Sequence, residues 1–253
     1  MNRRYFIEVA YKGKEYAGFQ VQENAHTIQA EVEQALKTYF RKPFSLTGSS
    51  RTDSGVNALQ NFFHFDQLEM PEDLYKPVYH LNAILPPDVV VKGIYPVKED
   101  AHCRFDALSR LYRYRIYRIK DPFLKESAYF YPYSLNLEAM QEAAQLVKAG
   151  RHFEAFSKKS TQVHTYECAI TTSEWQLSGD EIWYEVEANR FLRGMVRGLV
   201  GTMLKVGTGK LSLLEFESLL RERVHATAEF SVPGHGLYLV RVSYPSTGVF
   251  KVL

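Results

Sequence analysis

Cysteine is scarce in this sequence of 253 residues, which contains only Cys103 and Cys168. Two cysteines cannot form a disulfide framework, and they are too few for a structural zinc site with four cysteine ligands. We therefore expect reduced thiols and a cytoplasmic protein.

Long apolar runs are also missing. The longest apolar stretch, residues 191–206, contains Arg193, Arg197 and Lys205, so it does not qualify as a membrane span. Near the N-terminus, Glu8 interrupts the place where a signal peptide would have its apolar segment. The sequence thus predicts a protein without a membrane partner.

Neither sign of charge is in clear excess. The chain has 31 Lys and Arg against 29 Asp and Glu, which gives a formal net charge of +2. Charged residues make up 24% and hydrophobic residues 45% of the chain, as in ordinary globular proteins and unlike disordered or fibrous ones. At roughly 150 residues per domain, the length predicts one large domain or two modest ones.

Strand-like patterns recur along the whole chain. Alternating apolar residues and β-branched or aromatic composition predict single strands and one hairpin, at residues 5–11, 61–65, 111–119, 168–177 with 181–188, and 237–242. Their interspersion with helices favours an α+β fold with a mainly antiparallel sheet. A change of character near residue 100 makes two halves plausible.

Helix signals lie between these strands. Thr27 and Asn136 are each followed by apolar residues at helical spacing, so both are expected to be N-caps. A further helix is expected from about residue 191 to residue 205. Ser212 and Glu215 have the spacing of a capping box at the start of another short helix.

The positive charge is concentrated in two segments. Residues 101–125 contain seven Lys or Arg and two Asp, and residues 189–210 contain five basic residues and no acidic one, so each segment is +5. On a helix, Arg190, Arg193 and Arg197 would fall at i, i+3 and i+7 as one basic edge, although a solvated polar face has the same spacing. Two such segments favour a localised anionic partner, for which a phosphate backbone is the usual case.

Basic and aromatic residues alternate in the expected strand at 111–119. Tyr112 and Tyr114 would share one face, and Arg113 and Arg115 the other. One face could pack or stack on bases while the other meets solvent or phosphate, which suits single-stranded or flipped nucleotides. An amphipathic edge strand gives the same pattern, so both interpretations stay open here.

The most informative segment is the polar loop at residues 50–58, with the sequence SRTDSGVNA. Arg51 and Asp53 stand two residues apart, close to Gly55. By itself this pattern also fits an aspartate turn followed by glycine. The loop becomes specific only in combination with the other motifs of the chain.

Together these motifs resemble the TruA family of tRNA pseudouridine synthases. Residues 50–58 resemble the family signature GRTDAGVHA, with Ser50, Ser54 and Asn57 in place of its Gly, Ala and His. Further pieces follow in the family order along nearly the whole chain: residues 18–22 (GFQVQ for GWQxQ), 27–29 (TIQ for TVQ), 81–88 (LN and LPPD), 101–105 (AHCRF for FHARF), 110–114 (RLYRY for KxYxY), 191–202 (FLRGMVR and VGT) and 236–239 (GLYL).

The resemblance implies roles for four residues. The catalytic aspartate of the family, which acts as nucleophile or general base, falls on Asp53. The arginine that helps to hold the target nucleotide out of the stack falls on Arg51. The tyrosine that lies against the target base falls on Tyr112, and the arginine that pairs with the catalytic carboxylate falls on Arg197.

The resemblance also implies the fold, the substrate and the assembly. It implies two similar, ferredoxin-like α+β halves that join their sheets, with the Asp loop in residues 1–100 and the Tyr strand and Arg helix in residues 101–253. Such enzymes convert uridine to pseudouridine at positions 38–40 of the tRNA anticodon stem-loop, as homodimers without a cofactor, and we expect no metal. The alternative is a non-catalytic RNA-binding or RNA-folding protein. Such a binder would gain nothing from Asp53, so the retained carboxylate favours the enzyme.

Overall fold

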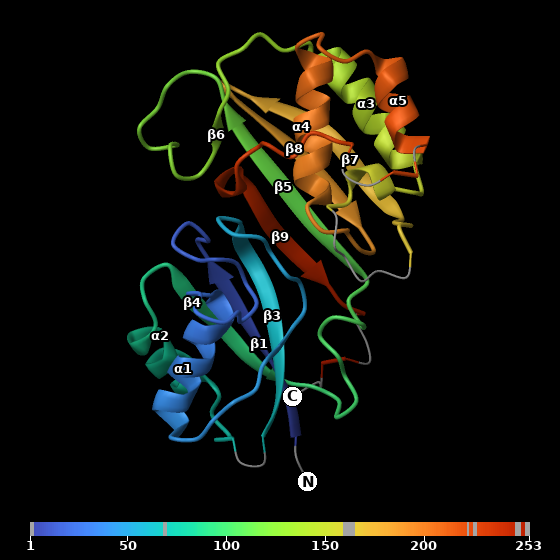
Figure 1. Cartoon of the computed structure of the whole chain (residues 1–253). Helices are drawn as coiled ribbons and strands as arrows, with labels where there is room; N and C mark the ends of the chain where they lie inside the picture. Colours follow the sequence, from blue (N-terminus) through green and yellow to red (C-terminus); the bar gives the residue numbers. More distant parts are fainter. Residues whose placement is uncertain are drawn as a thin grey trace. The chain divides into compact units, whose positions relative to one another are not determined.

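The computed structural model describes residues 3–67, 70–158, 165–221, 223–224, 227–245 and 249–250. The chain forms two compact units, shown in Figure 1: Met1–Leu108 with Leu239–Leu253, and Ser109–Tyr238. Each unit has its own sheet strands, helices and buried core.

In the first unit, strand β1 lies between two partners. It pairs antiparallel with β3 on one side and with β4 on the other, while the short β2 pairs with β3. The end of β9 contacts β3, because the backbone N–H of Val242 donates to Gln60 Oε1 at 3.0 Å. The elements of this unit are β1 (Arg3–Tyr11), α1 (Ile28–Phe40), β2 (Thr47–Gly48), β3 (Asn57–Gln67), α2 (Tyr75–Ile84), β4 (Val89–Pro96) and the end of β9 (Leu237–Ser243).

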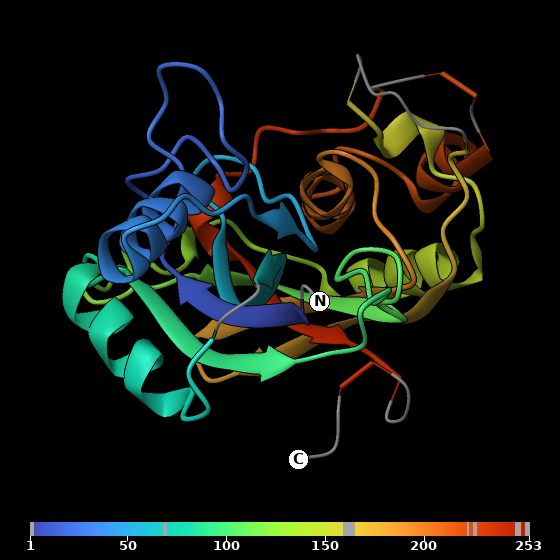
Figure 2. The same cartoon turned by 90° about the horizontal axis from the view of Figure 1, so that it is seen from below.

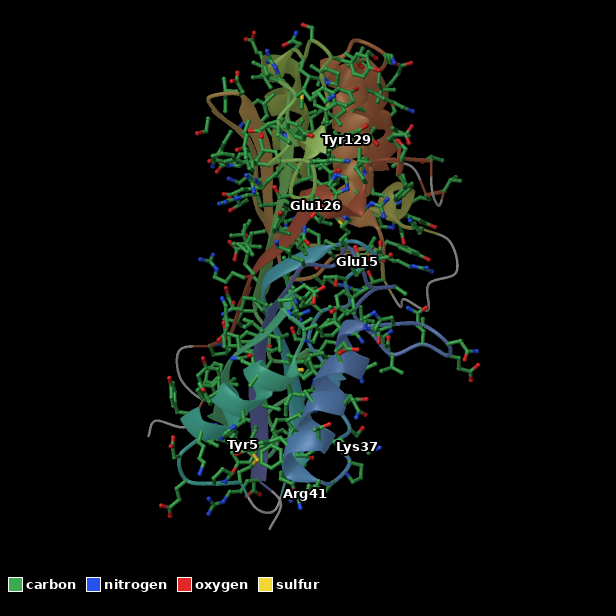
Figure 3. The ribbon with its side chains drawn as sticks, turned by 90° about the vertical axis from the view of Figure 1, so that its left-hand side faces the viewer. Tyr5, Glu15, Lys37, Arg41, Glu126 and Tyr129 are labelled. Atoms are coloured by element: carbon green, nitrogen blue, oxygen red, sulfur yellow. The ribbon has the colours of Figure 1, made fainter. Side chains whose placement is uncertain are left out.

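Helix α1 begins where its sequence predicts. Thr27 Oγ1 accepts the backbone N–H of Ala30 at 3.4 Å, which confirms the N-cap, and Ile28, Val32 and Leu36 are buried on one face. The helix ends at Arg41, whose φ of 57° is left-handed. Figure 3 shows Lys37 and Arg41 at this end of α1 and Tyr5 on β1.

Helix α2 is not among the elements expected from the sequence, and it contains a proline. Pro77 lies in the first turn of α2, where a helix needs no N–H from it. The helix buries Pro77 and Leu81, and it packs on α1 and β4. Figures 1 and 2 show α1 and α2 as neighbours.

In the second unit, strand β8 lies between β5 and β7 and is antiparallel to both, while β6 is parallel to β5. The predicted hairpin is confirmed: Ser178 pairs with Glu181 across a two-residue turn in which Gly179 has a φ of 59°. The elements of this unit are β5 (Ser109–Tyr117), β6 (Tyr129–Phe130), α3 (Leu137–Ala149), β7 (Ile170–Ser178), β8 (Glu181–Ala188), α4 (Met195–Gly207), α5 (Leu213–Arg221) and the start of β9. Figure 3 shows Tyr129 on β6 and Glu126 in the segment before it.

Helices α3 and α4 pack on one face of this sheet. Ser173 Oγ donates to the carbonyl of Ala144 in α3 at 2.8 Å, and the indole N–H of Trp175 lies 3.4 Å from Met203 Sδ in α4. Ser173 and Trp175 are two residues apart on β7 and therefore point to the same face. Figures 1 and 2 show both helices on that side of the sheet.

Two more predicted helix starts are confirmed in this unit. Asn136 Oδ1 accepts the N–H of Ala139 at 3.1 Å at the start of α3. Ser212 and Glu215 form the reciprocal capping box of α5: Glu215 Oε2 accepts the N–H of Ser212 at 2.8 Å, and Ser212 Oγ accepts the N–H of Glu215 at 3.2 Å.

The predicted start of the α4 helix is wrong. The helix begins at Met195 and not near residue 191, because Gly194 has a φ of 74° and breaks the helical path. Arg190 and Arg193 therefore precede the helix, and the predicted basic edge of Arg190, Arg193 and Arg197 does not exist. Apolar periodicity alone did not reveal this interruption.

The predicted α+β class with mainly antiparallel strands is confirmed within both units. The ferredoxin-like similarity of the halves and the joining of their sheets stay predictions. Across the part of the chain that the structure describes, no helix combines the length and the apolar character that a membrane crossing requires.

Candidate active site

The loop that carries Arg51 and Asp53 lies between β2 and β3 in the first unit. Its burial alternates: Arg51 is exposed, Thr52 is 8% exposed, and Asp53 is half-buried. Thr52 therefore points into the unit, and the two charged side chains on either side of it remain accessible to solvent. The structure thus brings Arg51 and Asp53 together on one loop.

The backbone of this loop is held by the segment that carries the GFQ motif. The N–H of Phe19 donates to the carbonyl of Thr52 at 3.1 Å, and a Cβ on Gly18 would lie 3.1 Å from the same oxygen. Gly18 has a φ of 115°, so it is required both for its backbone conformation and for this close approach. Phe19 is buried and stacks on Phe63 with ring centroids 4.4 Å apart.

The departures from the family signature are accommodated by hydrogen bonds. Ser54 Oγ donates to the carbonyl of Tyr16 at 3.0 Å, and the buried Asn57 Oδ1 accepts the N–H of Gly13 at 3.0 Å. Ser50 does not have a positive φ, so its side chain does not resist the local backbone. Ser54 and Asn57 therefore tie the loop to the residues that follow β1.

The second unit positions Tyr112 and Arg197 separately. Tyr112 lies on β5, is 8% exposed, and meets Phe191 edge to face with ring centroids 5.1 Å apart. Arg197 lies in the first turn of α4, where its Nε donates to the carbonyl of Val232 at 2.8 Å and its Nη2 to that of Phe230 at 3.4 Å. Two backbone acceptors thus restrict the orientation of this guanidinium.

Two of the three arginines of β5 form salt bridges within the sheet. Arg113 forms a salt bridge of 2.6 Å with Glu185, and Arg115 forms one of 2.6 Å with Glu181, both on β8. Tyr112 and Tyr114 are buried on the other face, as the alternation predicted. The segment 101–125 therefore presents less positive charge to an anionic partner than its composition indicates.

Comparison with known proteins identifies the family. The family model described as tRNA pseudouridine synthase matches residues 7–106 and 143–245. The chain belongs to the tRNA pseudouridine synthase family. It is 44% identical over 244 residues to the tRNA pseudouridine synthase A of Parabacteroides distasonis, a match that covers 96% of each chain. The proteins of that name from Porphyromonas gingivalis and Exiguobacterium sp. are 42% and 39% identical, over 96% of this chain and 98% of theirs.

Membership in this family confirms the resemblance on which the fold and the reaction class were predicted. The family is one of isomerases that modify tRNA. The individual roles of Asp53, Arg51, Tyr112 and Arg197 stay predictions. Two buried residues that contact the loop were not assigned a role from the sequence: the hydroxyl of Tyr11 lies 2.8 Å from Thr52 Oγ1, and Asn61 Nδ2 donates to the carbonyl of Ser50 at 2.9 Å. The one available signal was Asn61, a polar residue at the start of the otherwise aromatic run NFFHF.

Among the described residues, one group of side chains has the spread of a metal site. Potential ligand atoms of His64, His102 and Cys103 lie within 4.8 Å of one another. However, His64 Nδ1 accepts the backbone N–H of Cys103 at 3.3 Å, and His102 Nδ1 accepts that of Arg104 at 3.2 Å. Cys103 Sγ in turn donates to the carbonyl of Thr47 at 3.1 Å. These contacts indicate that the three residues form a hydrogen-bonded cluster in the first unit and not a metal site.

His64 is expected to make the stability of the protein pH-dependent. Burial, with smaller contributions from His102 and Arg4, lowers the pKa of His64 to about 4, against about 6.5 in an unfolded chain. Below pH 6.5 the unfolded state therefore binds the proton more strongly, and stability falls as the pH drops towards 4. Between pH 7 and pH 4.5 this group should lower the free energy of unfolding by about 2 kcal/mol.

Urea denaturation of the wild type and of His64→Asn at both pH values measures this contribution. For each protein, the free energy of unfolding at pH 4.5 is subtracted from that at pH 7. Comparing this difference between the two proteins removes the effect of other acid-titrating groups. The wild type should lose about 2 kcal/mol more than the variant between pH 7 and pH 4.5. Equal losses in the two proteins would show that His64 is not held neutral by the fold.

Proposed function

We propose that this chain converts uridine to pseudouridine at positions 38–40 of the tRNA anticodon stem-loop, with Asp53 as nucleophile or general base. The observation that carries the proposal is the loop that presents Asp53 and Arg51 on either side of a buried Thr52, in a chain of this family. Residues 1–100 would supply this loop, and residues 101–253 would supply Tyr112 and Arg197. The enzyme would act in the cytoplasm as a homodimer, without a cofactor or metal.

The reaction is an isomerisation in which all atoms are kept. The glycosidic bond from N1 breaks, the uracil rotates, a new bond forms from C5 to C1′ of the same ribose, and the C5 proton is lost while N1 gains one. A uridine in a stacked helix must first be flipped out, at a cost of a few kcal/mol. The exposed Arg51 is suited to occupy the vacated space and to bind phosphate.

The backbone turn at Asp53 restricts the mobility of this residue. Its backbone carbonyl accepts the N–H of Val56 at 3.2 Å, so the turn that begins at Asp53 is closed by a hydrogen bond. A half-buried carboxylate on such a loop can attack the ribose or remove its 2′ proton. Either route requires the carboxylate to lie close to the ribose of the bound uridine, and not only in contact with bulk water.

Tyr112 and Arg197 have the local rigidity that their proposed roles require. The ring of Tyr112 rests on Phe191, so it offers a fixed surface against which a flipped base can stack. A stacked aromatic ring would also exclude water while the uracil is detached. Arg197, restrained by two carbonyls, would pair with the catalytic carboxylate.

The proposal is tested by incubating the purified chain with an unmodified tRNA transcript and mapping pseudouridine in the product. Conversion at positions 38, 39 or 40 is expected, and a transcript with cytidine at these positions serves as the matched control. Tight binding without conversion would support the RNA-binding alternative. Conversion only at other positions would overturn the assignment to the anticodon stem-loop.

A further inference from the structure

A buried network of polar side chains lies beneath the loop that carries Arg51 and Asp53. The hydroxyls of Tyr11 and Thr52 are 2.8 Å apart, and Asn61 Nδ2 donates to the hydroxyl of Tyr11 at 3.1 Å. Tyr11, Thr52 and Asn61 are 4%, 8% and 0% exposed. Tyr11 comes from the end of β1 and Asn61 from β3, so two paired strands of the first unit supply the network.

The orientation of the Asn61 amide is determined by backbone groups. Its Oδ1 accepts the N–H of Phe62 at 2.9 Å, and its Nδ2 donates to the carbonyl of Ser50 at 2.9 Å. An N–H can only donate and a carbonyl can only accept, so the reverse orientation would lose both bonds. Ser49 Oγ adds a second donor to Oδ1 at 3.2 Å. Asn61 thereby uses all of its hydrogen-bonding capacity.

The network holds the two residues that flank Arg51. Asn61 fixes the backbone of Ser50, and Tyr11 fixes the side chain of Thr52. Thr52 is followed directly by Asp53. The anchored side chain of Thr52 therefore restricts the direction in which the side chain of Asp53 projects from the loop.

We propose that Tyr11 and Asn61 are positioning residues for pseudouridine formation: by holding Thr52 and Ser50 they set the placement of Asp53 and Arg51. This inference rests on the proposed function of Asp53. Neither residue needs to touch the substrate, because each acts through the loop.

The energetics of the network favour this role over simple core filling. A buried polar group is costly unless its hydrogen bonds are made, and each of these two residues has one partner in the loop: Thr52 for Tyr11 and Ser50 for Asn61. A displaced loop would break both of these buried hydrogen bonds, so the network favours one loop conformation. Burial raises the pKa of Tyr11 to about 12, so its hydroxyl keeps its proton throughout the neutral range.

Conservative variants separate positioning from stability. Tyr11→Phe removes one oxygen and keeps the ring that packs near Phe19, with centroids 5.9 Å apart. Tyr184→Phe is the matched control, because Tyr184 is also a buried tyrosine, with its hydroxyl 2.7 Å from Ser173 Oγ in the second unit. Both variants lose a buried hydroxyl, but only the first is connected to the Asp53 loop.

Single-turnover rates at saturating tRNA, tRNA dissociation constants and melting temperatures are measured for these proteins. Tyr11→Phe should slow turnover by about tenfold to a hundredfold with little change in tRNA affinity. Tyr184→Phe should lower the melting temperature to a similar extent but keep the wild-type rate. Thr52→Val should reproduce the loss of rate, and Thr52→Ser, which keeps the hydroxyl, should restore most of it.

The inference is overturned if Tyr11→Phe and Thr52→Val both turn over within twofold of Tyr184→Phe. If Tyr11→Phe does not fold, the comparison of Thr52→Val with Thr52→Ser decides alone, and equal rates for that pair count against the inference. An inactive Asp53→Asn beside a fully active Tyr11→Phe would overturn only this inference. An active Asp53→Asn would instead overturn the proposed function.

Discussion

Asp53→Asn is expected to form no detectable pseudouridine while binding tRNA with nearly wild-type affinity. The amide has almost the same shape as the carboxylate, but it is neutral and is a poor nucleophile and base. Loss of a group that forms or breaks a bond to the substrate typically lowers the rate by about 10⁴-fold or more. Arg51 and the other basic residues are unchanged, so the phosphate contacts that dominate affinity should persist.

Release of tritium from tRNA labelled at C5 of uridine measures this loss, and filter binding measures the affinity. Asp180→Asn is the matched control, because Asp180 is an exposed aspartate in the β7–β8 turn of the other unit. It makes the same chemical change outside the Asp53 loop and should keep full activity. Wild-type turnover by Asp53→Asn would show that another group performs the chemistry.

Gly13→Ala is expected to destabilise the first unit by about 3 kcal/mol and to lower activity strongly. A Cβ at Gly13 would lie 2.1 Å from the carbonyl oxygen of Val56 and 2.7 Å from its carbonyl carbon. Both are backbone atoms, so no side-chain rotation relieves the clash. The backbone at Val56 must therefore move, and Val56 is the residue whose N–H closes the turn on the carbonyl of Asp53.

Chemical denaturation and single-turnover assays of the purified variant test both expectations. Gly179→Ala is the matched control: Gly179 has a φ of 59°, but a Cβ there would meet no atom within 4 Å. It should cost about 1 kcal/mol for its left-handed backbone and leave turnover unchanged. If Gly13→Ala were no more destabilising than Gly179→Ala, the close approach of Gly13 to Val56 would not be a constraint on the fold.

The two parts of the proposed site differed in how far they could be predicted. The RTD sequence and its companion motifs identified Arg51 and Asp53 without a structure, because a family signature is a property of the residue order itself. The buried hydrogen-bond network of Tyr11, Thr52 and Asn61 was not predictable from the sequence. Tyr11 is 41 residues from Thr52 and 50 residues from Asn61, and no local pattern relates residues that far apart.

Charge was the least predictable property from composition. Counting basic residues marked segment 101–125 as strongly positive, yet Arg113 pairs with Glu185, 72 residues further along the chain. Lys205 in the second basic segment likewise forms a salt bridge of 2.8 Å with Glu229. The charge that a surface presents depends on such cross-strand and loop pairings, which a sum over a sequence window does not contain.

The amino-acid sequence by itself determined the family, the α+β class and those elements whose signals are local. The caps Thr27, Asn136 and Ser212 each bind a group three residues away, and the β7–β8 hairpin closes over two residues, so their physics is contained in short segments. Only the tertiary structure decided where α4 begins, which arginines are neutralised, and how Thr52 is anchored between Arg51 and Asp53. These outcomes depend on burial and on hydrogen bonds between distant segments, because a polar group in the interior must find its partner wherever the fold places one.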